Sequence, residues 1–181
     1  IYLIGERKDE CGGSAYYQLL EEMSDSTRDS MIGTNVPQPE PSDVSKQIEF
    51  VVKAISDGNV RTCHDVSNGG LLLALFEMTL SNRGQGGSIG VEIELDALGS
   101  DLSADKILFS ETGGFLCEVS PDNEEAFLKA AQEQSVEVKM IGKTIKSPTL
   151  KVLKSGDKLV DLNLSEITDI WTLGLKKAMN P

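Results

Sequence analysis

The stretch from residue 60 to residue 80, VRTCHDVSNGGLLLALFEMTL, constrains the fold of this chain more than any other. It starts as a short β-type run, passes through a polar segment ending in Gly69-Gly70, and continues as an apolar helix. A strand, a polar turn and glycines before a helix can present backbone N–H groups to an anion. The same pattern also fits a plain strand-to-helix turn, in which Ser67 or Asn68 caps the helix and the glycines permit the bend.

The helix expected over residues 71–80 has only Glu77 and Thr79 as polar members. A helix that is apolar on nearly every side must be covered on nearly every side, by its own domain or by a neighbouring one. A glutamate on such a helix lies either at the surface edge or buried, as an acceptor that ties down a loop. We favour the buried acceptor for Glu77.

The charge of the chain limits its partners. The 181 residues carry 17 Lys and Arg against 29 Asp and Glu, a net charge of −12. A negatively charged protein is repelled by nucleic acid and by an anionic membrane, so neither is expected as a partner. We find no membrane-length apolar run and no signal peptide, and the three widely spaced cysteines are typical of reduced thiols in a cytoplasmic protein.

The chain opens directly on a β-type run, Ile1 to Ile4, without a start methionine. We therefore expect residues 1–181 to form a single domain that is a fragment of a longer polypeptide.

Strands and helices alternate irregularly along the chain. The hydrophobic periodicity predicts strands at 1–4, 60–63, 87–95, 115–119, 136–145, 150–154 and 158–162. It predicts helices at 15–23, 41–57, 71–80, 121–134 and 165–177, with a glycine-rich turn over 81–87. The Ser155-Gly156-Asp157 turn indicates an antiparallel hairpin. These features favour an α+β fold with a mixed, largely antiparallel sheet packed with helices.

The sequence also predicts which faces of two helices are buried. The helix over 41–57 is expected to be capped by Ser42 and to bury one apolar stripe. That stripe comprises Val44, Ile48, Val51, Val52 and Ile55. The last helix is expected to turn Ile167, Ile170, Trp171, Leu173 and Leu175 mostly inward.

A second polar segment, Ser110 to Gly114, repeats the chemistry of the first. It has a carboxylate (Glu111), two hydroxyls and a glycine pair at the start of a strand. Loops at the same end of a sheet can converge, so we expect the two segments to share one polar cleft. Two unrelated tight turns are the alternative.

Among these polar residues Asp65 is the best metal candidate, because magnesium takes one or two carboxylates together with phosphate oxygens and water. His64, the single imidazole, is more often a satisfied polar residue at a strand end than a base. Cys63 points to the opposite face of the strand, which argues against a Cys–His pair. Neither a Walker A loop nor a GxGxxG fingerprint occurs.

Three segments carry a family resemblance. HDVSNGGLLLALFEM (64–78) resembles the HDxSDGGL…ALAEM signature of the synthetase subunit of phosphoribosylformylglycinamidine synthase, in the aminoimidazole ribonucleotide synthetase superfamily. IYLIGE with GGSAYY (1–17) and LFSETGGFLCEV (108–119) match further segments in the same order. The chain is similar to the last of that family's four domains, the second B domain, with its synthetase C-terminal-domain fold.

The resemblance implies a part of an ATP-dependent carbon–nitrogen ligase of purine biosynthesis. Such an enzyme makes formylglycinamidine ribonucleotide from formylglycinamide ribonucleotide, ATP and glutamine-derived ammonia. Its implied partners are the remaining A and B domains, a glutaminase subunit and a small third subunit. The principal catalytic residues belong to the other domains, so none is expected here.

For this chain the resemblance implies an auxiliary site for ATP or ADP with Mg²⁺. Asp65 is similar to a magnesium ligand and Ser67 to an ATP-contacting residue. The expected nucleotide-site residues are Ser67, Asn68, Gly69, Gly70, Ser110 and Glu111. Asn68 stands where many members have aspartate, and Gly114-Phe115 lacks the usual arginine. A structural or interaction domain without ligand, and the equivalent domain of a hydrogenase-maturation dehydratase, are the alternatives.

We predict that residues 1–181 alone have no synthetase activity, because the chain opens without a start methionine and has a single histidine. A turnover assay on the purified chain with formylglycinamide ribonucleotide, ATP and ammonia tests this. Product formation above the enzyme-free blank would contradict it.

Overall fold

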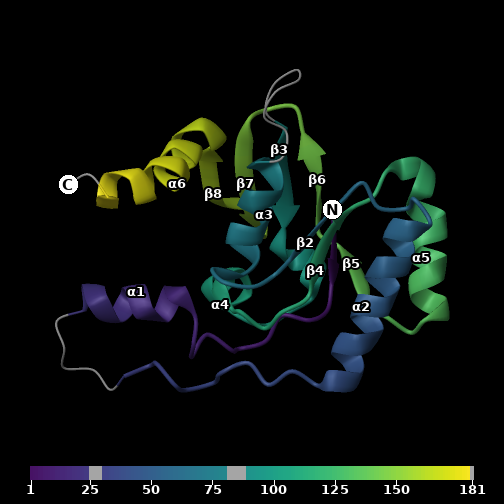
Figure 1. The fold of residues 1–181 in the computed structure, drawn as a ribbon, viewed down its shortest axis with the longest axis horizontal. Coiled ribbons are helices and arrows are strands. Elements are labelled where there is room, and N and C mark those ends of the chain that lie inside the picture. Colours follow the sequence, from purple (N-terminus) through teal and green to yellow (C-terminus); the bar gives the residue numbers. More distant parts are fainter. Residues whose placement is uncertain (25–29, 81–88, 180–181) are drawn as a thin grey trace.

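The strands in the described part of the chain form two separate four-stranded sheets, and the helices pack around them (Figure 1). The computed structural model describes residues 1–24, 30–80 and 89–179. The expected turn over 81–87 lies outside the described residues. The architecture is α+β, as the sequence predicts, but the strands expected to form one sheet are divided between two.

The first sheet contains the N-terminal strand at its interior. Its order is β2-β4-β1-β5, with β1 (Tyr2–Ile4), β2 (Thr62–Asp65), β4 (Phe115–Glu118) and β5 (Val138–Met140). Every pair in it is antiparallel. Because successive side chains alternate between faces, Leu3 and Tyr2 enter different cores. Leu3 packs in the larger core with the second sheet, and Tyr2 packs in the smaller core with Phe50 and Phe127 from two helices.

The second sheet is mixed. Its order is β6-β3-β7-β8, with β3 (Gly90–Glu94), β6 (Gly142–Ile145), β7 (Thr149–Lys154) and β8 (Asp157–Asn163). β3 pairs in parallel with β7, and the other two pairings are antiparallel. β7 and β8 form the hairpin predicted from the Gly-Asp turn, with positive φ at Ser155 (52°) and Gly156 (80°).

Residue 141 is where the chain passes from one sheet to the other. The sequence predicts one strand over 136–145, but β5 belongs to the first sheet and β6 to the second. Ile141, 1% exposed, donates its N–H to the carbonyl of Ile1, and its own carbonyl accepts from the N–H of Glu94. Gly142 allows the close approach, because a Cβ there would lie 2.1 Å from the Glu92 carbonyl oxygen.

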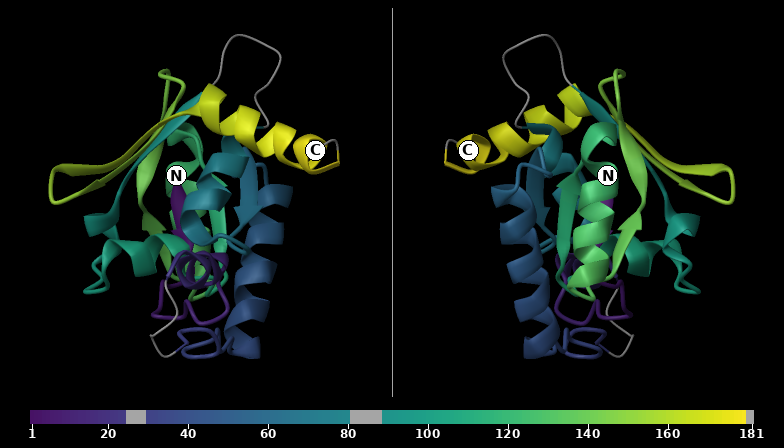
Figure 2. Two further views of the ribbon diagram at one scale, coloured as in Figure 1. Left: turned by 90° about the vertical axis from the view of Figure 1, so that its left-hand side faces the viewer. Right: turned by 90° about the vertical axis from the view of Figure 1, so that its right-hand side faces the viewer.

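The helices lie on both sides of the first sheet. Helix α2 (Pro41–Ser56) and helix α5 (Glu124–Glu133) lie side by side against one face (Figure 2). Helix α3 (Gly70–Leu80) is in the larger core on the other face, where α4 (Ala104–Phe109) also packs. The residues of α3 are all buried or half-buried, which confirms that this helix is covered on nearly every side. Helix α1 (Ala15–Met23), helix α6 (Leu164–Met179) and two short 3-10 turns, η1 (Leu95–Leu98) and η2 (Pro121–Asn123), complete the fold.

The expected apolar stripe of α2 is wrong. The helix buries Phe50, Val51 and Ala54, whereas the other four stripe residues are between 37% and 58% exposed. These four are Val44, Ile48, Val52 and Ile55. Phe50 decides the face, because its ring packs 5.2 Å from that of Phe127 in α5. The Ser42 cap is wrong as well: Glu40 is the N-cap without a side-chain bond, and Pro41 starts the helix with φ already fixed.

The inward face expected for α6 is largely wrong. Ile167 packs against the larger core, but Ile170 is 73% and Trp171 49% exposed. The indole of Trp171 still makes an edge contact with Phe76 of α3, with ring centroids 6.0 Å apart. Among the described residues, no helix combines the length and apolar character that crossing a membrane requires.

The position of Tyr2 generates a prediction about alkaline stability. Burial, and the hydrogen bond that the phenol donates to Glu124, raise the pKa of Tyr2 from 10.0 to about 12. The folded state therefore favours the neutral phenol, and this stabilisation is complete below pH 10.0 and is lost as the pH approaches about 12. Urea unfolding at several alkaline pH values should show a steeper loss of stability for wild type than for Tyr2→Phe. Parallel curves for the two proteins would contradict the assignment.

Candidate functional site

The register of the first sheet brings the two polar segments together. In the β2–β4 pair, Asp65 at the end of β2 lies opposite Phe115 at the start of β4. The segment that follows β2 and the segment that precedes β4 therefore lie at the same edge of the sheet. The N–H of Val66 donates to the carbonyl of Gly114, 2.9 Å away, which continues the pairing beyond the strands. The predicted convergence of the two segments is confirmed.

Glu111 connects the second segment to two helices. Its Oε1 atom accepts from the N–H of Gly69, 2.8 Å away, just before α3. The same oxygen accepts from the N–H of Ala15, 3.0 Å away, the first residue of α1. A carboxylate at a helix N-terminus is favoured by the unpaired amides and by the helix dipole. The anion at the start of α3 in this structure is thus a side chain of the protein.

Arg7 also holds the second polar segment, Ser110 to Gly114, in place. It was not among the residues predicted from the sequence. Its guanidinium donates to the carbonyls of Ser110 (2.8 Å) and Gly113 (2.9 Å). The side chain is buried, and this burial lowers the pKa of Arg7 to about 10. The signal for Arg7 in the sequence is a basic residue in the loop that follows a buried strand, which is too common to be informative.

The glycines before α3 are required by close packing. Gly69 and Gly70 have φ values of +78° and +68°, and the N–H of Gly70 donates to the carbonyl of Ser67. A Cβ on Gly70 would lie 2.6 Å from the carbonyl oxygen of Leu108 in α4. The glycine pair therefore lets the start of α3 lie directly against α4.

The sequence-predicted site residues divide into two groups. Asp65, Ser67 and Asn68 are exposed, and Asp65 has 62% of its side chain accessible. Ser110 is fully buried, with its hydroxyl against that of Thr112, and the Glu111 carboxylate is bonded to the two amides. The geometry thus leaves the first group accessible to a ligand and gives the second group partners within the protein. Assignment of either group to a nucleotide stays a prediction.

His64 and Glu77 form a contact beside this edge. The Nδ1 atom of His64 lies 2.7 Å from the backbone oxygen of Asp65, and Nε2 lies 3.4 Å from Oε2 of Glu77. His64 is thus a satisfied polar residue at a strand end. Glu77 is half-buried rather than buried, and it contacts His64 in β2 instead of a loop, so the role predicted for it is only partly correct.

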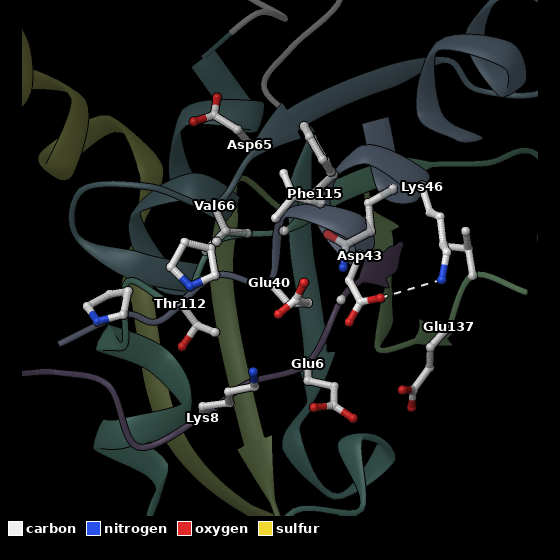
Figure 3. A pocket seen from close by; sticks show the side chains of 18 of the residues that line it. Glu6, Lys8, Glu40, Asp43, Lys46, Asp65, Val66, Thr112, Phe115 and Glu137 are labelled. Atoms are coloured by element: carbon white, nitrogen blue, oxygen red, sulfur yellow. Dashed lines mark ion pairs between the residues drawn. The ribbon is translucent and has the colours of Figure 1, made fainter. Parts of the chain in front are cut away.

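A groove of about 650 Å³ opens next to the two segments (Figure 3). Its wall is formed by both segments, by the start of α2 and by the chain leading into β5. Six carboxylates and two ammonium groups line it: Glu6, Glu40, Asp43, Asp65, Glu111 and Glu137, with Lys8 and Lys46. Asp65 lies at one end, with its carboxylate turned away from the other labelled acids. Lys46 pairs with Asp43 at 3.6 Å, and no three acidic, thiol or imidazole side chains within the described ranges are grouped closely enough to hold a metal ion by themselves.

Comparison with known proteins identifies the family of this domain. The family model described as "AIR synthase related protein, C-terminal domain" matches residues 1–155, and the chain belongs to this family. Phosphoribosylformylglycinamidine synthase subunit PurL of Methanothrix thermoacetophila is 32% identical over 179 residues, which are 99% of this chain and 21% of that protein. The PurL of a Thermoanaerobacter species is 31% identical over 180 residues, 99% of this chain and 22% of that protein. The chain therefore spans about a fifth of the length of these relatives.

Solved structures share the fold. "T. maritima PurL complexed with FGAR" superposes with a TM-score of 0.71 at 17% identity, covering 92% of this chain and 27% of that one. A chain of a HypE-HypF complex gives a TM-score of 0.57, also at 17% identity, covering 88% of this chain and 51% of that one.

The contacts of Glu111 generate a stability prediction. Glu111→Gln replaces a charged acceptor of two amides by a neutral one, and should lower the free energy of unfolding by about 1–3 kcal/mol. Urea denaturation measures the change. Glu6→Gln is the matched control, because Glu6 is an exposed carboxylate on the wall of the same groove and should leave stability unchanged. Equal stabilities of the two variants would show that the Glu111 contacts do not stabilise the fold.

Proposed function

We propose that residues 1–181 act as the C-terminal domain of a phosphoribosylformylglycinamidine synthase, within its synthetase subunit. The single observation that carries the proposal is similarity of about 30% identity along 99% of the chain to PurL proteins. The enzyme would form formylglycinamidine ribonucleotide from formylglycinamide ribonucleotide, ATP and glutamine-derived ammonia, as an ATP-dependent ligase of purine biosynthesis. A cytoplasmic location is part of the same proposal.

The domain would contribute to an auxiliary Mg-nucleotide site rather than to the chemical step. Structures similar in fold are described as T. maritima PurL complexed with ATP and with ADP, which supports a nucleotide as the ligand class. Asp65, Ser67, Asn68 and the Gly69-Gly70 turn would face the nucleotide phosphates. Ser110 and Glu111 would hold that turn in place from behind, through the bond from the Gly69 amide.

The donor set at this edge fits magnesium. Mg²⁺ in proteins is commonly bound through one or two carboxylates, with phosphate oxygens and water completing its coordination. Asp65 offers one accessible carboxylate next to the exposed hydroxyl of Ser67. An excess of carboxylates around the groove also disfavours a free phosphate anion and favours one that arrives with a cation. Magnesium would supply charge neutralisation for the phosphates when bound.

The remaining A and B domains, a glutaminase subunit and a small third subunit would be the partners. A structure titled "Structure of PurLQS from Thermotoga maritima" has a similar fold, with a TM-score of 0.66, which supports a multi-subunit assembly. The sequence relatives at about 30% identity along almost the whole chain are PurL proteins, which favours this enzyme over the hydrogenase-maturation alternative.

A purely structural domain is the second candidate, favoured by one observation. Amides of the proposed phosphate turn have partners in the protein: Gly69 bonds to Glu111 and Gly70 to Ser67. A turn closed in this way can serve packing alone.

Titration calorimetry of Mg-ADP against the intact protein separates the two candidates. We expect Asp65→Ala to weaken binding at least about tenfold, because it removes the accessible carboxylate that would hold the cation. Asp43→Ala, on another part of the same groove wall, is the control and should bind as wild type does. Unchanged affinity for Asp65→Ala, with intact circular dichroism, would favour the structural domain.

A further inference from the structure

Two cysteines face each other across the strands that hold the candidate site. Cys63 of β2 lies directly opposite Cys117 of β4 in the antiparallel register. Their sulfur atoms are 3.7 Å apart, and both are free thiols. In the sequence 53 residues lie between these two cysteines, so their spacing does not indicate a pair.

The hydrogen-bond pattern of the two strands indicates that Cys63 and Cys117 are spaced as in a disulfide. In the same register, the N–H of Val66 donates to the carbonyl of Gly114, so residues 66 and 114 form a hydrogen-bonded pair. Hydrogen-bonded and non-hydrogen-bonded pairs alternate along two antiparallel strands, so Cys63 and Cys117 form a non-hydrogen-bonded pair. The Cα atoms of such pairs are about 4.5 Å apart, closer than those of hydrogen-bonded pairs. Disulfides span Cα separations of about 4.4–6.8 Å, and this pair falls within that range.

The two thiols differ in access. Cys117 is fully buried in the smaller core, whereas Cys63 is half-buried on β2, the edge strand of the sheet. Both side chains lie on the face of the sheet that α2 and α5 cover, away from His64 and Glu77. An external reagent therefore reaches Cys63 first, and the sulfur nearest to the product of that reaction is Cys117.

We propose that Cys63 and Cys117 form a thiol–disulfide exchange site, which small disulfides of the glutathione type convert into a cross-strand disulfide. The sulfur of Cys63 attacks one sulfur of oxidised glutathione, so that a mixed disulfide forms and one glutathione leaves as the thiol. The sulfur of Cys117 then attacks Cys63, and the second glutathione leaves. Two protein thiols are oxidised, one glutathione disulfide is reduced, and the two protons go to the departing thiols.

The Cys63–Cys117 disulfide would link β2 covalently to β4. Cys63 lies two residues before Asp65 and Cys117 two residues after Phe115, so the link would lie at the base of both polar segments. Fixing the strands at that point limits how far the two segments can separate. The inference stands on the thiol pair alone and does not depend on the proposed nucleotide site.

Peptide mapping after treatment of the folded, intact protein with oxidised glutathione tests the proposal. Trypsin places Cys63 in the peptide 62–83 and Cys117 in the peptide 107–129. We expect a linked pair of these peptides whose mass is two hydrogen atoms below the sum of the reduced peptides. Dithiothreitol should return both peptides to the free form.

Three variants fix the order of the steps. Cys117→Ser should stop at the mixed disulfide of Cys63 with glutathione, and Cys63→Ser should leave the buried Cys117 unmodified. Cys11→Ser is the matched control, because Cys11 is a buried thiol outside the strand pair, and it should cross-link as wild type does. The proposal is overturned if wild type keeps both thiols free, stops at the mixed disulfide, or cross-links only after denaturation.

Discussion

The Glu111 carboxylate accepts hydrogen bonds from the backbone amides of Gly69, the residue before α3, and Ala15, the first residue of α1. This shared acceptor fixes the starts of α3 and α1 against the segment that precedes β4. Arg7 donates hydrogen bonds to two carbonyls of the same segment, and these carbonyls replace part of the water that the buried guanidinium gives up. The edge of the first sheet, and with it the groove, depends on this connected set of polar contacts.

The arrangement separates the residues that support the edge from those that face outward. Glu111, Ser110 and Arg7 are bonded inside the protein, and Asp65, Ser67 and Asn68 remain on its surface. A polar edge that is held from within keeps its shape whether or not anything binds to it. This is the property that pre-organised binding sites require, and it serves domain packing equally well. The chemistry of the outward residues therefore decides between these two roles.

Much of the local structure could be predicted from the sequence, because it depends on neighbours in the chain. The apolar run 71–80 could only be a covered helix, and the Gly156-Asp157 turn could only join two antiparallel strands. The convergence of the two polar segments could be predicted because each adjoins the end of a strand. The errors arose where the partner lies elsewhere: Phe50 meets Phe127, so α2 buries a different face from the one with most aliphatic residues.

The sequence by itself determined the order of the elements, the α+β class and the residue types available at the polar edge, because periodicity, turn chemistry and charge are local properties. Only the tertiary structure decided that residue 141 divides one expected strand between two sheets. It alone brought Cys63 opposite Cys117, the Arg7 guanidinium to the carbonyls of Ser110 and Gly113, and the Glu111 carboxylate to the amide of Gly69. These outcomes depend on strand register and on contacts between distant residues, and no spacing within a single segment encodes them.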